Sequence, residues 1–185
     1  ELLDAAQNSP SGKVDYDVDR YRAVVEKVAG MAGWGQSKGE GVYQGIAAHF
    51  SYGSYVAQVA EVSVEDGNIK VHKVYCAVDC GIIINRSGAE QQIEGGIVDG
   101  LGHAMYAEQT LRNGVPAHQN FDTYRLIRIS ETPEIEIAFI ENNLRPGGLG
   151  EPGLPPTGGA VANAVFAATG QRLRKQPFVH NTLLG

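Results

Sequence analysis

The sequence predicts an α+β fold in which a mixed or antiparallel sheet, partly built from hairpins, packs against a few helices. Helical periodicity of apolar residues marks three segments, 17–32, 85–109 and 160–170. Turn dipeptides typical of hairpins occur twice, at Asp66-Gly67 and Asn113-Gly114. Strands and helices follow one another without the regular alternation of a parallel sheet, which favours α+β over α/β.

The first predicted helix covers residues 17–32. Apolar side chains recur there at helical spacing, at Val18, Tyr21, Val25 and Val28. Acidic residues gather at the start and Gly30 stands near the end, as helix termini favour. We therefore expect an N-terminal helical segment over residues 1–33 and the main domain over residues 34–185.

A hairpin follows, with its turn at residues 66–68 between two runs rich in β-branched residues. Val62 and Val64 alternate with polar neighbours, which predicts a half-buried strand. The return run carries both cysteines, Cys76 and Cys80. On one face of a strand they would lie too far apart for an unstrained disulfide, so we expect two buried thiols.

The second predicted helix contains four interior glycines. Its apolar face is Ile93, Ile97, Leu101 and Met105, and the glycines are Gly95, Gly96, Gly100 and Gly102. Each interior glycine costs about 1 kcal/mol relative to alanine, so a compensating reason is needed. Close approach of another backbone or of a ligand explains them as well as tight helix–sheet packing does.

The rest of the chain predicts a second hairpin, one strand and one helix. The strand is indicated by Ile135, Ile137 and Phe139, which alternate with Glu134 and Glu136. The helix covers residues 160–170, is rich in small residues, and ends at Gly170 as a C-cap.

Composition excludes several classes of protein. With 185 residues and 43% hydrophobic residues the chain can form a core, so general disorder is not expected. The net charge of −6 and the lack of a large basic cluster argue against a nucleic-acid partner. No stretch reaches the roughly 20 apolar residues of a membrane span.

The segment "GGLGEPGLPPTGGAVANAV", residues 147–165, places one carboxylate, Glu151, between Gly150 and Pro152. The proline extends the backbone of Glu151, and a helix begins a few residues later. Unpaired N–H groups at that helix start could hold an anionic ligand, or the carboxylate itself could be held for a function. By pattern alone, a surface acid in a loop is the simpler interpretation.

Gln92 is the second candidate, because its long amide stands beside Gly95 and Gly96, where a ligand could approach the backbone. An exposed glutamine without function is the alternative. The five histidines show no metal-ligand spacing, so no side chain of this chain is expected to bind a metal directly.

Four segments together resemble a known family. "FSYGSYVAQVAEVSVEDG", "VDCGIIIN", "QIEGGIVDGLGHAMYAEQ" and "GLGEPGLPPTGGAVANAVFAATG" occur in the order found in the C-terminal part of the large subunit of the xanthine oxidase family of molybdenum hydroxylases. The double glycine, "NFDTYRL" and "GEPGLPP" are most similar to the isoquinoline 1-oxidoreductase beta-subunit branch. The fold implied is that of a molybdopterin-binding domain.

The resemblance implies hydroxylation of an N-heteroaromatic or aldehyde carbon with water as the oxygen source. It implies a molybdopterin cofactor with molybdenum, in the cytosine dinucleotide form, and no protein ligand to the metal. Glu151 matches the family's general base, which deprotonates the hydroxyl on molybdenum. Gln92 matches the glutamine near the pterin, with Gly95, Gly96 and Gly150 as further cofactor-binding positions.

The resemblance also implies partners: the remainder of the large subunit and a small ferredoxin-like subunit with two-iron clusters. The chain is far shorter than the family's large subunit and begins with Glu1, so we expect a piece that is inactive alone. We expect a cytoplasmic or periplasmic compartment. The alternative is a non-catalytic assembly or ligand-binding domain with the same fold.

Overall fold

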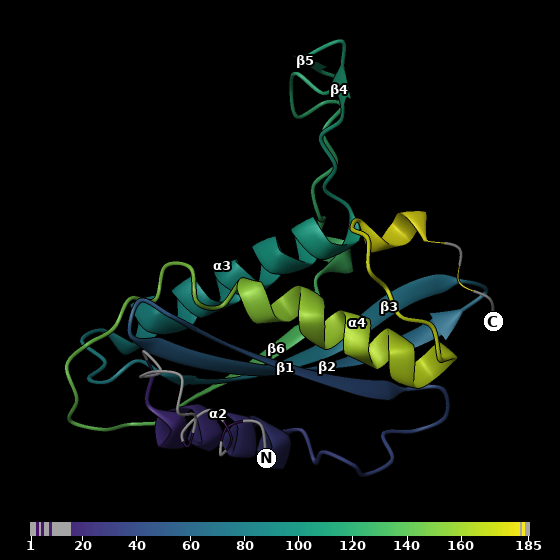
Figure 1. Cartoon of the computed structure of the whole chain (residues 1–185). Coiled ribbons are helices and arrows are strands. Elements are labelled where there is room, and N and C mark those ends of the chain that lie inside the picture. The colour runs from purple at the N-terminus through teal and green to yellow at the C-terminus, as the bar shows by residue number, and fades with distance from the viewer. Residues whose placement is uncertain (1–2, 4, 6–7, 9–15, 182, 184–185) are drawn as a thin grey trace.

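The computed structural model describes residues 3, 5, 8, 16–181 and 183, and a four-stranded sheet forms the middle layer of this part of the chain (Figure 1). The strands are β1 (Tyr43–Ser51), β2 (Ser54–Glu65), β3 (Asn68–Asp79) and β6 (Glu134–Phe139), in spatial order β1-β2-β3-β6. The first three strands are antiparallel, whereas β6 is parallel to β3. The expected α+β class with a mixed sheet is confirmed.

Helices cover both faces of this sheet. On one face lies α2 (Val18–Met31), which packs against β2 and β3; on the other lie α3 (Arg86–Met105) and α4 (Pro155–Thr169) (Figure 1). Asp17 caps α2, because its carboxylate accepts hydrogen bonds from the N–H groups of Asp19 and Arg20 at 2.9 and 3.2 Å. The predicted helix at residues 17–32 is confirmed.

Two hydrophobic clusters fill the spaces between the layers. Val56, Val74 and Val78 belong to the cluster under α3 and α4, while Tyr55 and Ala77 belong to the cluster under α2. The half-buried strand expected from Val62 and Val64 is correct at Glu65, which is exposed, and wrong at Ser63, which is buried. Nearer the start of β2, Tyr55, Ala57 and Val59 belong to the cluster under α2.

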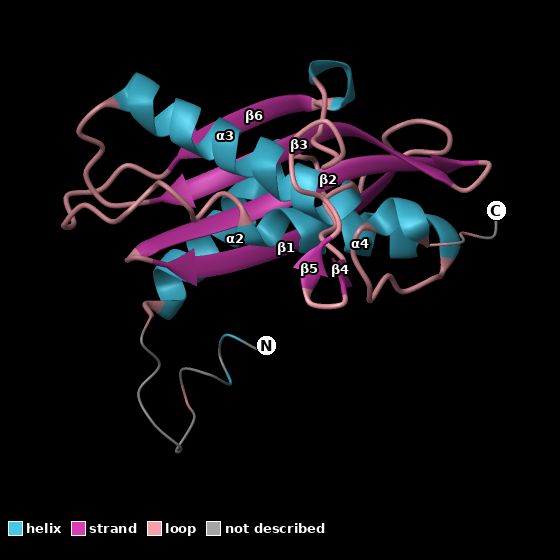
Figure 2. Cartoon of the chain, turned by 90° about the horizontal axis from the view of Figure 1, so that it is seen from above, coloured by secondary structure: helices cyan, strands magenta, loops and turns pink. Residues whose placement is uncertain are grey.

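The second hairpin carries β4 (Leu111–Arg112) and β5 (Val115–Pro116), which form their own small sheet. Figure 1 shows this hairpin at the tip of an arm that extends away from the body, and Figure 2 views the arm from above. Large apolar side chains along residues 111–129 stay exposed, among them Phe121 at 75% and Ile129 at 96%. The short helical turns are η1 (Ile129–Glu131) and η2 (Phe178–His180).

Helix ends follow the local chemistry of the sequence. Asn85 caps α3, accepting a hydrogen bond from Gly88 N–H at 2.9 Å. Helix α4 begins at Pro155, earlier than the small-residue run predicted, because proline fits the first turn of a helix. Gly170 ends it with a left-handed φ of 73°, as predicted.

Both cysteines are buried free thiols, as expected. Burial raises the pKa of the Cys76 thiol, and a hydrogen bond with Gln58 only partly offsets this. Within the described part of the chain, no helix is both long and apolar enough to cross a membrane.

Candidate functional site

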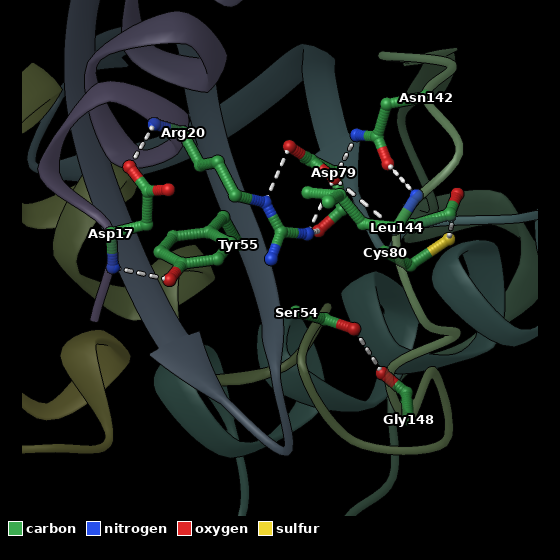
Figure 3. Close-up of polar contacts among 10 residues, drawn as sticks. Asp17, Arg20, Ser54, Tyr55, Asp79, Cys80, Asn142, Leu144 and Gly148 are labelled. Atoms are coloured by element: carbon green, nitrogen blue, oxygen red, sulfur yellow. Dashed lines mark hydrogen bonds and ion pairs between the residues drawn. The ribbon is translucent and has the colours of Figure 1, made fainter. Parts of the chain in front are cut away.

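The loop that carries Glu151 starts at the end of β6. Its first part is hydrogen-bonded to the end of β3. There Asp79, only 2% exposed, accepts two hydrogen bonds from Arg20 of α2, at 2.9 and 2.6 Å (Figure 3). It also accepts hydrogen bonds from the amide of Asn142 at 2.9 Å and from Gly81 N–H at 3.1 Å. Burial alone would raise the pKa of Asp79, but the donors and the Arg20 charge together lower it. Asp79 therefore ties the sheet, α2 and the loop together as an anion.

The next part of the loop lies against the turn between β1 and β2. Gly147 N–H donates to the carbonyl of Cys80 at 2.8 Å, and Gly148 N–H donates to the carbonyl of Tyr52 at 2.9 Å. The hydroxyl of Ser54 donates to the carbonyl of Gly148 at 2.7 Å (Figure 3). A Cβ on Gly147 would lie 2.4 Å from the Ser54 oxygen, so only glycine fits there.

A buried polar group holds the loop on the far side of Glu151. The amide of Gln58, fully buried in β2, donates to the carbonyl of Gly153 at 2.6 Å. Its oxygen accepts from the hydroxyl of Thr157 at 2.8 Å. A buried amide is costly unless it is hydrogen-bonded, and this one is satisfied by the loop itself. Gln58 thus fixes the backbone two residues after Glu151.

The glycines of α3 let the same loop approach the helix. A Cβ on Gly96 would lie 3.3 Å from Leu154 N, and one on Gly100 would lie 2.7 Å from the Leu154 carbonyl oxygen. Close approach of another backbone, one of the explanations left open above, is therefore the explanation at these two positions. Gly95 differs, because a Cβ there would meet nothing within 4 Å.

Glu151 itself is exposed, and its surroundings are polar. A Cβ on Gly150 would lie 3.8 Å from the Oε1 of Gln92, so the loop and the exposed amide of α3 share one surface. From the other side the Glu151 carboxylate reaches the Tyr52 phenol and raises its pKa, chiefly through a side-chain hydrogen bond and further through its charge. A neighbouring pocket of about 470 Å³, lined by residues 81–83 and 141–143 together with Arg86, does not include Glu151.

The structure thus brings Gly150, next to Glu151, close to Gln92, and it brings the loop after Glu151 onto Gly96, whereas a Cβ on Gly95 would meet nothing within 4 Å. Three residues of this region were missed by sequence reasoning: Tyr52, Gln58 and Thr157. A Tyr-Gly pair between two apolar runs could have indicated a turn at Tyr52. Nothing local marks Gln58 and Thr157, which lie 99 residues apart in the sequence.

The architecture is that of a molybdopterin-binding domain, as the comparisons show. The sequence profile of the molybdopterin cofactor-binding domain matches residues 4–133. The chain belongs to this family, as part of the molybdenum-binding subunit found in xanthine-oxidase-type enzymes.

Relatives support the assignment. The chain is 35% identical to the isoquinoline 1-oxidoreductase subunit beta of Brevundimonas diminuta, over 85% of this chain and 21% of that protein. It is 34% identical, with the same coverage, to the membrane-bound aldehyde dehydrogenase [pyrroloquinoline-quinone] of Gluconacetobacter polyoxogenes. The aldehyde oxidoreductase from Desulfovibrio desulfuricans superposes with a TM-score of 0.59 at 26% identity, over 71% of this chain and 16% of that one. The chain therefore spans about a fifth of the length of these curated relatives.

Proposed function

We propose that the chain forms part of a molybdenum hydroxylase that oxidises a carbon of an N-heteroaromatic ring or an aldehyde, and that Glu151 is the general base. The observation that carries the proposal is that one loop combines a fixed backbone with an exposed carboxylate. Its backbone is held on both sides of Glu151, by Gly148 contacts and by Gln58, while the carboxylate is exposed. A base must be held in a fixed geometry and must also be reachable by the group that gives up the proton.

The described residues fit a molybdopterin cofactor. Among the described residues, no group of three or more His, Cys, Asp or Glu side chains could hold a metal ion. The amide of Gln92 offers both a donor and an acceptor beside Gly150. Gly95 leaves open space on its side of α3, whereas Gly96 contributes by letting the loop lie close.

When bound, the molybdenum centre supplies the two-electron oxidation of the substrate carbon. The role of Glu151 would be to accept a proton at a carboxylate oxygen. A positioned base of this kind contributes about 10²–10⁴-fold to the rate. Pro152 restricts the backbone of Glu151, and the hydrogen bonds at Gly148 and Gly153 hold the loop on either side of it.

The remaining parts of the enzyme belong to the same proposal. They are the cytosine dinucleotide form of the pterin, the remainder of the large subunit, and a small subunit with iron–sulfur clusters. We expect the chain alone not to convert substrate. The boundary at residue 34 between an N-terminal helical segment and the main domain stays a prediction, and so does the cytoplasmic or periplasmic compartment. The names of the relatives, an isoquinoline oxidoreductase and an aldehyde dehydrogenase, support the two substrate classes.

Glu151→Gln in the assembled enzyme tests the role of the carboxylate. The amide keeps the shape but is not a base, so kcat should fall by at least about 10²-fold while molybdenum and pterin contents stay unchanged. Glu65→Gln, an exposed acid at the other end of β2, is the matched control and should leave kcat unaltered. Full turnover by Glu151→Gln would refute the proposal.

The exposed apolar residues of the arm favour a second candidate, an assembly function. Phe121 is 75% exposed and Ile129 is 96% exposed. If assembly were the only function, Glu151→Gln would leave both turnover and subunit association unchanged. Serine substitutions at Phe121 and Ile129 would then be the ones that weaken association.

A further inference from the structure

Strand β1 is an outer edge of the four-stranded sheet, since β2 is its only neighbour among the described strands (Figure 2). A sheet edge presents unpaired N–H and C=O groups, so proteins usually protect it with a short strand, charges, proline or a bulge. The opposite edge, β6, is protected in this way: it has six residues, and Glu134 and Glu136 form ion pairs with Lys73. Strand β1 has nine residues, contains no Asp, Glu, Lys, Arg or Pro, and pairs with β2 in an unbroken register.

The turn between β1 and β2 determines which backbone groups of β1 point away from the sheet. Residues 52–53 have φ values of 53° and 75°, as in a two-residue turn with both residues left-handed. The strand residues on either side of such a turn form a hydrogen-bonded pair, and bonded and non-bonded pairs then alternate along the ladder. The residues whose N–H and C=O groups point outward are therefore Ile46, Ala48 and Phe50.

A side chain of α4 supports this assignment and marks where the open edge begins. The amide nitrogen of Asn163 donates to the carbonyl of Ile46 at 2.9 Å, as expected for a carbonyl that points away from β2. The amide oxygen of Asn163 accepts from Arg172 at 3.2 Å. Within the described part of the chain, no hydrogen bond of this kind reaches the outward groups of Ala48 and Phe50.

The side chains along this edge are only partly covered. Ile46, Ala48 and Phe50 lie at the margin of the cluster under α2, and Ala47 lies at the margin of the cluster under α3 and α4. A further strand beside β1 would cover both margins and pair the open backbone groups at the same time. The edge is therefore suited to an extended segment with apolar side chains on both faces.

We infer that an extended segment from the remainder of the large subunit adds to the sheet at β1 and pairs with Ala48 and Phe50. Two curated relatives, 34% and 35% identical, align over 85% of this chain but over only 21% of their own length. Most of such a subunit thus lies outside this chain and is available to cover an edge that has no protection of its own. The inference rests on the proposal that the chain works within a larger subunit, and not on the role of Glu151.

Amide hydrogen exchange in the assembled large subunit tests the pairing residue by residue. On a free edge the rates alternate, because the inward amides of Ala47 and His49 are bonded to β2 whereas those of Ala48 and Phe50 are open. With an added strand, all four amides should exchange within about tenfold of one another. Alternating rates would overturn the inference. Protection of the outward amides that disappears on dilution would overturn it as well, because the occupant would then be a second copy of the chain.

Two proline substitutions in the same subunit distinguish a paired strand from a loop that merely covers the edge. Ala48→Pro removes an outward N–H, which an edge strand tolerates. It should release the added strand, so that Phe50 exchanges at least about tenfold faster while His49 stays protected. Ala47→Pro is the matched control, because it removes an N–H that bonds to β2 and should destabilise the sheet with or without an added strand. Unchanged exchange at Phe50 in Ala48→Pro would refute the pairing, and the wild-type rates decide the question if that variant does not fold.

These outcomes are separate from those for the proposed base. Alternating exchange along β1 refutes the added strand and leaves the assignment of Glu151 standing. Normal turnover by Glu151→Gln refutes the base and leaves the exchange pattern of β1 unaffected.

Discussion

Two glycines on one helix, Gly95 and Gly100, offer a matched test of why α3 tolerates so many of them. At Gly95 an added methyl meets nothing within 4 Å. Alanine there should raise the free energy of unfolding by about 0.5–1 kcal/mol, because glycine costs that much in a helix interior. The substitution changes propensity without changing any packing contact.

At Gly100 the same propensity gain is outweighed by overlap. The methyl would lie 2.7 Å from the Leu154 oxygen and 2.9 Å from the Thr157 hydroxyl, whereas ordinary contact begins at 3.4 Å. The helix and the loop would have to separate by about 0.7 Å (3.4 minus 2.7). Both neighbours are themselves hydrogen-bonded, Leu154 to Glu151 and Thr157 to Gln58, so neither can move freely. Overpacking of this kind costs about 1–3 kcal/mol.

The free energies of unfolding of the two variants should therefore differ by about 1–3 kcal/mol. Gly95→Ala should be more stable than wild type, and Gly100→Ala should be less stable than Gly95→Ala. For a chain of this size that corresponds to a gap of about 2–12 °C in thermal midpoint, measured by circular dichroism at a helical wavelength. Gly96→Val should also fall below wild type, since its Cβ already lies 3.3 Å from Leu154 N. Equal midpoints for Gly95→Ala and Gly100→Ala would refute close approach as the reason for glycine.

Three further predictions concern the elements that hold the site. Gln58→Leu should lower the free energy of unfolding by about 2–3 kcal/mol, because the Gly153 carbonyl loses its buried donor. In urea titrations, the double variant Gln58→Leu with Thr157→Val should lose less stability than the two single variants lose in sum, because the two side chains share a hydrogen bond. Gly45→Ala should destabilise by about 3 kcal/mol or more, since its methyl would lie 2.1 Å from Ala164 N, and a near-normal urea midpoint would contradict the packing of β1 on α4. The lowered pKa of Asp79 means that its contribution to stability is present above the unfolded value of about 3.9 and is lost as pH falls through the folded value. Asp79→Asn should thus be less stable than wild type at pH 7 but lose less on acidification, and parallel acid curves for the two proteins would show that Asp79 is not held as an anion.

Elements that bury one apolar face could be predicted from the sequence. The stripe of Ile93, Ile97 and Leu101 predicted α3, and the Asp66-Gly67 dipeptide predicted the β2–β3 hairpin. Strand β1 was missed, because Gly45 and a run of small residues carry no alternation. Its pairing and burial come from β2 and α4, which lie far away in the sequence.

The position of Glu151 could be predicted only as a motif, not as a geometry. The hydrogen bonds that fix its loop join residues 94, 95 and 99 positions apart, and no local pattern encodes such pairings. Gln58 looks like an ordinary polar residue within a strand until the loop is placed over it. Tyr52 is bulkier than the Asn or Asp usual at its turn position, so in the sequence only Gly53 marks the turn.

These two kinds of departure from local preference meet at the same loop. Gly96 and Gly100 lower the helix propensity of α3, and Tyr52 occupies a turn position that Asn or Asp would fill at lower cost. Each becomes understandable only through what it contacts between Gly148 and Leu154. Sequences usually agree with their fold at every level, and the exceptions concentrate at functional sites. Local costs from a helix and from a hairpin thus converge on the segment that carries one exposed carboxylate, and under the proposed function the requirement that they serve is the placement of Glu151.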